Sequence, residues 1–372
     1  MCDLHNGKSH RQKEIQVHLI EPTLEDYSGH CYGLVRSFCD ASGGLRVTVW
    51  GGRGSEKLDF PQVVEVNPLF RRRLRMPQLF ALFLRLLRGG GRVVVMTARR
   101  GDLLLARLAA GRALPPGRLF FYFHWYRETP RRLAFLEKAA HAQPEVTILA
   151  TTQSVADTFS RAGFRNVLLL PYPLTATPAA TADAQPFTHL LYAGAARQDK
   201  GFGRVVALVE RLREQGEHWP ISVQISADHY GKYDDQTLAD IARLERCDYP
   251  GLRLIRTPLS PSGYSALFPG GICLQPYDRS EFRDRASGVT MDALVNGCPV
   301  IGPSGTWIAE LVTRNRAGVV LEEFDPDSII AAARRVIEGY TSYRNNALAG
   351  GAALQARSWE PLLAQLRATV RA

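Results

Sequence analysis

Short apolar segments with the composition of β-strands alternate with helical segments along most of this 372-residue chain. The first series begins at residues 16–20 (QVHLI), which are apolar and partly β-branched. Its further predicted strands lie at residues 45–50, 92–96, 119–123, 146–150 and 166–170, with helical segments between most of them. Strand, loop, helix and strand in this order are typical of βαβ units, which build parallel sheets covered by helices. The alternation therefore predicts an α/β fold.

A break at residues 175–186 (TATPAATADAQP) separates this series from a second one. The segment is rich in proline and small residues and has no periodicity, which is linker composition. The second series opens with a strand at 189–193 and an amphipathic helix at 202–215. We therefore predict two Rossmann-like domains, at residues 1–178 and 179–355. The apolar stripe of the tail, 356–372, predicts a helix that packs back on the N-terminal domain.

Bulk properties exclude several classes of protein. The sequence has no run of 18 or more apolar residues and no apolar stretch at its start, so we expect neither a membrane span nor a secretory signal. The six cysteines form no C-x-x-C pair, no H-x-x-x-H is present, and no D-x-D is flanked by strand-like residues, since Asp325-Pro-Asp327 is typical of a helix N-terminus. We expect a cytoplasmic protein without a metal site.

A glycine-rich turn follows the first strand of the second series. It runs from Gly194 through Arg197 to Lys200, immediately before a predicted helix. Glycine allows a close backbone approach, and the free N–H groups at a helix N-terminus attract phosphate. Lys200 adds a point charge and Arg197 a fork of donors. The turn predicts a phosphate site, although an ordinary strand-to-helix turn with solvated charges has the same pattern.

A second motif brackets the start of a later helix with two carboxylates. Asp284 and Asp292 stand eight positions apart, on either side of Ser287, Gly288 and Val289. The backbone N–H groups between the two acids are candidates for binding phosphate, and the carboxylates for accepting hydrogen bonds from sugar and ribose hydroxyls. A solvated acid pair around an ordinary turn is the alternative.

The two motifs together resemble the retaining, family 4-type glycosyltransferases of the GT-B fold. In that family a G…K-G segment opens the second domain, and an E-x7-E segment followed by A-x-x-x-G-x-P-V-I comes later. This chain has Lys200-Gly201, then Asp284-x7-Asp292, and then Ala293 followed by 297–301 (GCPVI). The resemblance covers the second domain and the terminal helix well, and the first domain only in outline. It implies a GT-B fold with two Rossmann-like domains.

The resemblance also implies roles for individual residues, although this chain departs from the family motif at some positions. Both glutamates of the family motif are aspartates here, and the arginine that usually follows the glycine is Ala195, for which Arg197 is the substitute we expect. Asp292 is expected to hold the ribose. The donor sugar is expected to meet Asp284 or, because aspartate is shorter than glutamate, Glu281 instead.

The first domain offers two further candidates. Gly29 lies in the loop after the first strand, at the sheet edge where α/β sites form. His124 follows the strand at 119–123, and in the resembling family a histidine at this place touches the donor sugar. A partly buried histidine that is satisfied by a carbonyl is the alternative for His124.

Positive charge is concentrated in the first domain. The net charge is +10, and nine arginines and no acidic residue lie between Arg71 and Arg100. Residues 77–88 (PQLFALFLRLLR) form a basic amphipathic helix whose leucines and phenylalanines can enter a membrane interface while its arginines meet lipid phosphates. A domain helix with a solvated basic side is the alternative. We expect an anionic membrane surface at 71–88 and no nucleic acid, because no nucleic-acid module is present.

The resemblance implies transfer of a hexose-type sugar from a nucleotide-sugar donor to a glycan or lipid-linked acceptor, with retention and without a metal. The donor is a substrate, so no cofactor is expected. Lys200 and the N–H groups near Gly288 would stabilise the diphosphate leaving group. Two alternatives remain: a non-catalytic membrane-surface protein on a degenerate transferase scaffold, and a dinucleotide-dependent oxidoreductase, although no G-x-G-x-x-G follows the first strand in either half.

Overall fold

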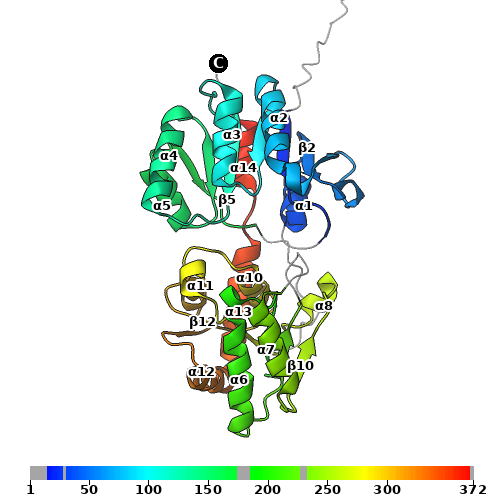
Figure 1. Ribbon diagram of the computed structural model, residues 1–372, viewed down its shortest axis with the longest axis vertical. Coiled ribbons are helices and arrows are strands. Elements are labelled where there is room, and N and C mark those ends of the chain that lie inside the picture. Colours follow the sequence, from blue (N-terminus) through cyan, green and yellow to red (C-terminus); the bar gives the residue numbers. More distant parts are fainter. Residues whose placement is uncertain (1–14, 28–30, 174–184, 227–232, 369–372) are drawn as a thin grey trace, which may run out of the picture.

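The structure is a computed structural model that describes residues 15–27, 31–173, 185–226 and 233–368. Two parallel sheets, each flanked by helices, form two domains that lie one above the other in Figure 1. The chain passes from the first sheet to the second between Leu169 and His189. The predicted boundary at residue 178 lies outside the described residues.

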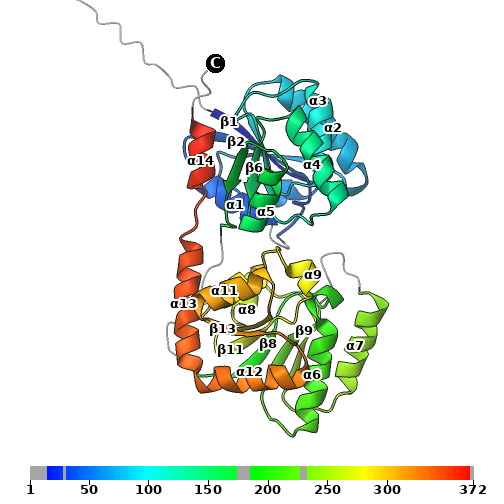
Figure 2. The same ribbon diagram turned by 90° about the vertical axis from the view of Figure 1, so that its left-hand side faces the viewer.

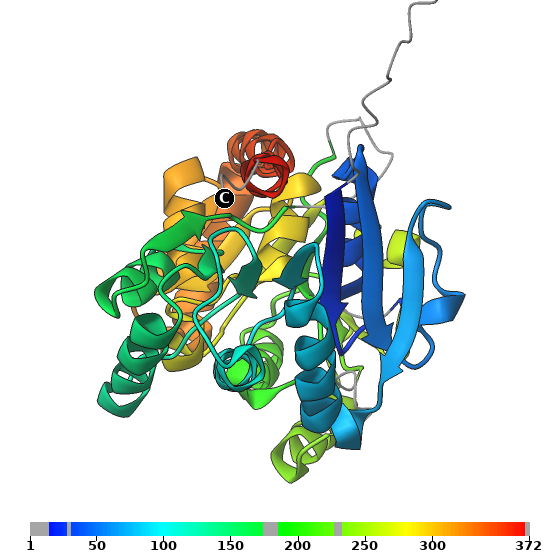
Figure 3. The same ribbon diagram turned by 90° about the horizontal axis from the view of Figure 1, so that it is seen from above.

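The first domain contains a seven-stranded sheet in the order β3-β2-β1-β4-β5-β6-β7. In Figure 3 the strands of this sheet that come first in the sequence, in blue, lie at one side, and those that come last, in green, lie at the other. The strands are β1 (Ile15–Glu21), β2 (Leu45–Gly52), β3 (Glu65–Phe70), β4 (Arg92–Val95), β5 (Leu119–Phe123), β6 (Thr147–Ala150) and β7 (Asn166–Leu169). The helices are α1 (Cys31–Ala41), α2 (Arg75–Arg88), α3 (Arg100–Ala110), α4 (Pro130–Ala142) and α5 (Gln153–Arg161).

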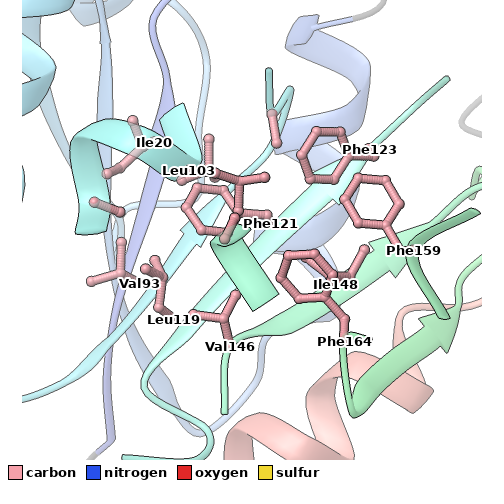
Figure 4. Packing of buried hydrophobic residues seen from close by; sticks show 14 of the residues in the cluster. Ile20, Val93, Leu103, Leu119, Phe121, Phe123, Val146, Ile148, Phe159 and Phe164 are labelled. Atoms are coloured by element: carbon pink, nitrogen blue, oxygen red, sulfur yellow. The ribbon is translucent and has the colours of Figure 1, made fainter. Parts of the chain in front are cut away.

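Aromatic side chains fill much of the core of this domain. Figure 4 shows Phe121 and Phe123 of β5 with Phe159 of α5 in one packed cluster. The rings of Phe123 and Phe159 have centroids 4.4 Å apart. Because β5 is buried on both faces, its sequence reads as a continuous apolar run, as expected for the centre of a parallel sheet. The loops that follow β5 and β6 therefore begin at strands that are fixed in the core.

The second domain contains a six-stranded parallel sheet in the order β10-β9-β8-β11-β12-β13. The strands are β8 (His189–Tyr192), β9 (Ile221–Gln224), β10 (Leu252–Ile255), β11 (Gly271–Leu274), β12 (Val300–Pro303) and β13 (Gly318–Leu321). The helices are α6 (Phe202–Glu214), α7 (Asp235–Arg246), α8 (Pro261–Ser265), α9 (Arg279–Phe282), α10 (Gly288–Val295), α11 (Trp307–Asn315), α12 (Pro326–Glu338) and α13 (Tyr340–Gln355).

The terminal helix α14 (Glu360–Arg367) returns to the first domain, as the sequence predicts. Figure 2 shows α13 beside the second domain and α14, in red, beside β1 and β2 of the first. Trp359, just before α14, packs edge-on against Phe38 with ring centroids 5.3 Å apart. The Arg92 guanidinium donates to the carbonyl of Gln365 over 3.0 Å. These contacts fix the helix on the first domain.

Three longer elements are missing from the sequence predictions, as are the short helices α8 and α9. β3 was not predicted, because this half-exposed edge strand contains Pro68 and lacks clean alternation. α13 was not predicted, because Gly350 and Gly351 interrupt its helical pattern. A Cβ at Gly351 would lie 2.6 Å from the carbonyl oxygen of Leu294, so α13 and α10 pack too closely for a larger residue. α11 was not predicted either, although Thr306 caps it through a hydrogen bond from the Ala309 N–H.

Candidate active site

Lys200 stands in a tight turn between β8 and α6. Gly201 follows it with a φ of 69°, and a Cβ there would lie 1.9 Å from the carbonyl oxygen of Pro276. Only glycine therefore permits both this conformation and this contact. The Asp278 N–H also donates to the carbonyl of Asp199 over 2.9 Å. These contacts hold the turn against the loop after β11.

Two predicted phosphate-binding segments meet at Gly194. This residue has a φ of 101°, and a Cβ there would lie 3.1 Å from Lys200 Nζ and 3.3 Å from Val289 Cγ2. Val289 is the second residue of α10. The ammonium group and the Val289 side chain, in the first turn of α10, therefore both lie next to the position that a side chain at residue 194 would take. Glycine at this position avoids a contact with both groups.

The N-terminus of α10 is arranged to receive an anion. The Ser287 hydroxyl caps the helix by accepting from the Thr290 N–H over 3.3 Å. Gly288 and Val289, as the first two helical residues, have no intrahelical acceptor for their N–H groups. Gly288 is exposed, and a Cβ there would meet no atom within 4 Å. The Ser287 hydroxyl thus accepts from an N–H group of the helix, while the N–H groups of Gly288 and Val289 have no acceptor within the helix.

Lys200 lies among other charges. Burial, followed by the positive charges of Arg197 and Arg285, lowers the pKa of Lys200 to about 8. Arg197 donates from Nε to Asp199 Oδ1 over 2.8 Å and from Nη2 to Oδ2. Lys200 Nζ itself lies 5.7 Å from the centroid of the Tyr277 ring. A bound anion would raise the pKa of Lys200 again, because it favours the charged form.

Asp292 is a half-buried acid on α10. Burial raises the pKa of Asp292 to about 7, and a hydrogen bond from the Tyr264 hydroxyl partly offsets this effect. The carboxyl group therefore titrates near neutrality, which is unusual for aspartate and typical of functional sites. Tyr264 was not identified from the sequence.

Asp284 does not line the same space as Lys200. It borders a pocket of about 750 Å³ between the domains, formed by α5 of the first domain and the loops and α11 of the second. The lining residues of this pocket include Ser154, Asp157, Arg161, Arg283, Thr306 and Glu310. The pocket is rich in carboxylates, guanidinium groups and hydroxyls, which are groups that hydrogen-bond to sugars.

The first domain contributes through the loop after β5. The ring of His124 contacts the rings of Tyr122 and Tyr172, with centroids 4.8 and 5.3 Å away. Farther along the loop, Arg127 Nη1 lies 3.1 Å from Glu281 Oε1 of the second domain. Glu281 is thus engaged across the domain boundary. Gly29 lies outside the described residues.

Residues 71–88, the basic segment, are not arranged as the sequence analysis predicts. Leu79, Leu82, Phe83 and Leu86 of α2 are buried in the core of the first domain. They cannot also enter a membrane, so that part of the expectation is wrong: an amphipathic helix on a sheet turns its apolar face inward. What remains at the surface is an arginine-rich side, with exposed Leu74 and Met76 at its start.

Two further structural findings concern metals and membranes. Among the residues that the structure describes, no group of three or more His, Cys, Asp or Glu side chains is arranged to hold a metal ion. No helix within the same residues is long and apolar enough to cross a membrane.

The sequence matches no protein-family profile and no curated protein sequence. The structure, in contrast, is similar to many solved structures. Sucrose-phosphate synthase from Thermosynechococcus elongatus superposes with a TM-score of 0.69 at 13% identity, covering 95% of this chain and 97% of that one. Anabaena HepE in complex with UDP-glucose gives 0.67 at 13% identity, covering 95% and 98%. WaaG, a glycosyltransferase involved in lipopolysaccharide biosynthesis, gives 0.64 at 14% identity, covering 94% and 98%.

The chain has the GT-B fold. Each of the three superpositions covers nearly the whole of both chains, so the agreement includes both domains and the connection between them. The predicted fold class is therefore confirmed.

Proposed function

We propose that this GT-B protein is a glycosyltransferase that moves a hexose-type sugar from a nucleotide-sugar donor to a glycan or lipid-linked acceptor. The observation that carries the proposal is the convergence of Lys200 Nζ and the first turn of α10 on Gly194. A diphosphate leaving group needs positive charge and N–H donors at one place, and this arrangement supplies both. HepE, which has the same fold, was crystallised with UDP-glucose, and this supports a sugar nucleotide as the donor.

In this proposal the second domain binds the donor. Lys200 and the amides of Gly288 and Val289 neutralise the diphosphate, and Asp292 accepts hydrogen bonds from the ribose. The donor sugar lies between His124 of the first domain and the carboxylates of the second, with Asp284 or Glu281 as its contact. Transfer proceeds with retention and without a metal. The acceptor attacks from the side of the leaving group, and the donor phosphate assists its deprotonation.

A thermal-shift screen of sugar nucleotides tests the proposal, because a ligand that binds only the folded state raises its melting temperature. We expect one group of sugar nucleotides with a common base to stabilise the protein. The Lys200→Ala variant should lose that stabilisation, whereas Lys138→Ala, an exposed lysine on α4, should keep it. Absence of stabilisation by any sugar nucleotide would contradict the proposal. Slow hydrolysis of the stabilising donor in water would exclude the non-catalytic alternative.

The acceptor side of the proposal includes a membrane surface. We propose that residues 71–88 rest on anionic lipid at the inner face of a membrane, through exposed arginines such as Arg72 and Arg73 and the exposed Leu74 and Met76. Lipid attraction amounts to about 1 kcal/mol for each basic residue near the surface. Flotation with phosphatidylserine vesicles should carry the protein upward, and vesicles of phosphatidylcholine alone should not. Equal flotation with both would contradict an electrostatic contact.

A further inference from the structure

The turn that carries Lys200 lacks one positive charge that the resembling family provides there. Ala195 follows Gly194, where that family usually has an arginine. A nucleoside diphosphate carries more negative charge than a single ammonium group can neutralise. A second cation is therefore needed beside Lys200, and Arg197 of the same turn and Arg285 are the two candidates.

Arg285 lies beside this turn although it belongs to a distant part of the sequence. Its Nη1 is 3.8 Å from Asp199 Oδ2, and its positive charge contributes to the lowered pKa of Lys200. The side chain retains 30% of its exposure. Within the described chain, the guanidinium group of Arg285 donates no hydrogen bond. The N–H donors of this guanidinium group are therefore not used by an acceptor of the Lys200 turn.

Aromatic rings hold Arg285 in this position. Its guanidinium carbon lies 4.9 Å from the centroid of the Phe282 ring and 5.7 Å from that of Trp125. Phe282 is buried in the second domain, whereas Trp125 is 44% exposed and belongs to the loop after β5 of the first domain. Stacking on rings fixes the plane of a guanidinium group and leaves its N–H edge free for an anion.

Arg197, the substitute expected from the sequence, is placed less favourably. It makes the fork-like pair with Asp199 described above, which occupies its Nε and Nη2. Arg285 reaches the same carboxylate only at 3.8 Å, beyond hydrogen-bonding distance. Of the two arginines, Arg285 is the one whose donors a diphosphate can take without first breaking a hydrogen bond to Asp199.

We propose that Arg285 is the second cation that binds the donor diphosphate, together with Lys200, and that Trp125 of the opposite domain positions it. The inference rests on the proposed function and names a residue for the same site. Because Trp125 comes from the first domain, binding of a diphosphate by Arg285 also favours the arrangement in which the two domains are in contact.

Calorimetric titration tests the inference. UDP, GDP, ADP and dTDP are titrated into the wild-type protein, and the diphosphate that binds is then compared with its parent nucleoside. For Arg285→Gln we expect the affinity for the diphosphate to fall at least about tenfold, with the affinity for the nucleoside unchanged. Arg285→Lys should restore part of the loss, because it keeps the charge but not the fork. Trp125→Ala should give a smaller loss of the same kind.

Two controls separate the possible failures. Arg213→Gln removes an equal charge from an exposed position on α6 and should leave both affinities unchanged. If the wild type binds none of the diphosphates, the proposed function itself fails. If Lys200→Ala weakens binding of the diphosphate while Arg285→Gln does not, or if Arg197→Gln causes the loss instead, only the role of Arg285 is refuted.

Discussion

The two domains share one architecture but present their site residues in different ways. In the second domain, the groups around Gly194 come from closely packed backbone turns, and Gly194 and Gly201 have positive φ angles that favour glycine. In the first domain, Trp125 reaches the second domain from the loop after β5 by its side chain, which contacts Arg285. A site built on backbone approach leaves a recognisable motif in the sequence. A site built on side chains from a loop leaves almost none.

This contrast predicts that the second domain supplies most of the binding of the leaving group. Lys200→Ala should lower turnover at least about tenfold, which corresponds to about 1.4 kcal/mol or more of transition-state stabilisation. Turnover is measured with the donor that the thermal-shift screen identifies, and Lys138→Ala is the matched control. Equal turnover of Lys200→Ala and wild type would remove Lys200 from the site.

The lowered pKa of Lys200 makes the same interaction depend on pH. An anion favours the charged lysine, so affinity for a nucleoside diphosphate should be complete well below the pKa of about 8 and should decrease above it. Between pH 7 and 9 the decrease should be up to about tenfold. Titration calorimetry over this range checks it. Lys200→Arg keeps its charge and should bind with little change, and a wild-type affinity that is flat to pH 9 would contradict the assignment.

Substitution of His124 tests the first domain. If the ring contacts only the donor sugar, His124→Ala should lower turnover about fivefold, the effect of one hydrogen bond. Affinity for the nucleoside diphosphate should stay unchanged. The two measurements together distinguish a sugar contact from general disruption of the loop. A parallel loss of diphosphate affinity would show that the two domains do not divide the donor between them in the way proposed here.

The contrast between backbone turns and loop side chains also explains which features could be predicted from the sequence. Alternation of strands and helices was sufficient for the fold class, because parallel strands buried on both faces read as continuous apolar runs. The turn at Lys200 could be predicted from its place between a strand and a helix. The stacking of Arg285 on Trp125 could not, because it depends on how two separately folded domains meet.

Other parts of the site were predicted less well, for reasons of local geometry. Asp284 stands within the recognised motif, yet it borders the pocket against α5 and not the space at Gly194. Spacing in a sequence does not reveal which of two neighbouring spaces a side chain borders. Arg285 is its immediate neighbour, and the only signal in the sequence was the arginine missing at Ala195.

Asp292 should have the smallest effect, one that appears in stability. Its pKa rises from 3.8 in the unfolded chain to about 7 in the folded protein, so its contribution to stability is complete below about pH 4 and is lost as the pH rises through about 7. From pH 5 to pH 8 the melting temperature of the wild type should therefore decrease by a few degrees relative to that of Asp292→Asn, whose amide does not titrate. Asp235→Asn, at an exposed position on α7, should follow the wild type. Parallel curves for the wild type and Asp292→Asn would mean that this carboxylate is solvated. Asp292 would then not be the buried acid proposed for the ribose, and the evidence for the donor site in the second domain would reduce to the Lys200 turn.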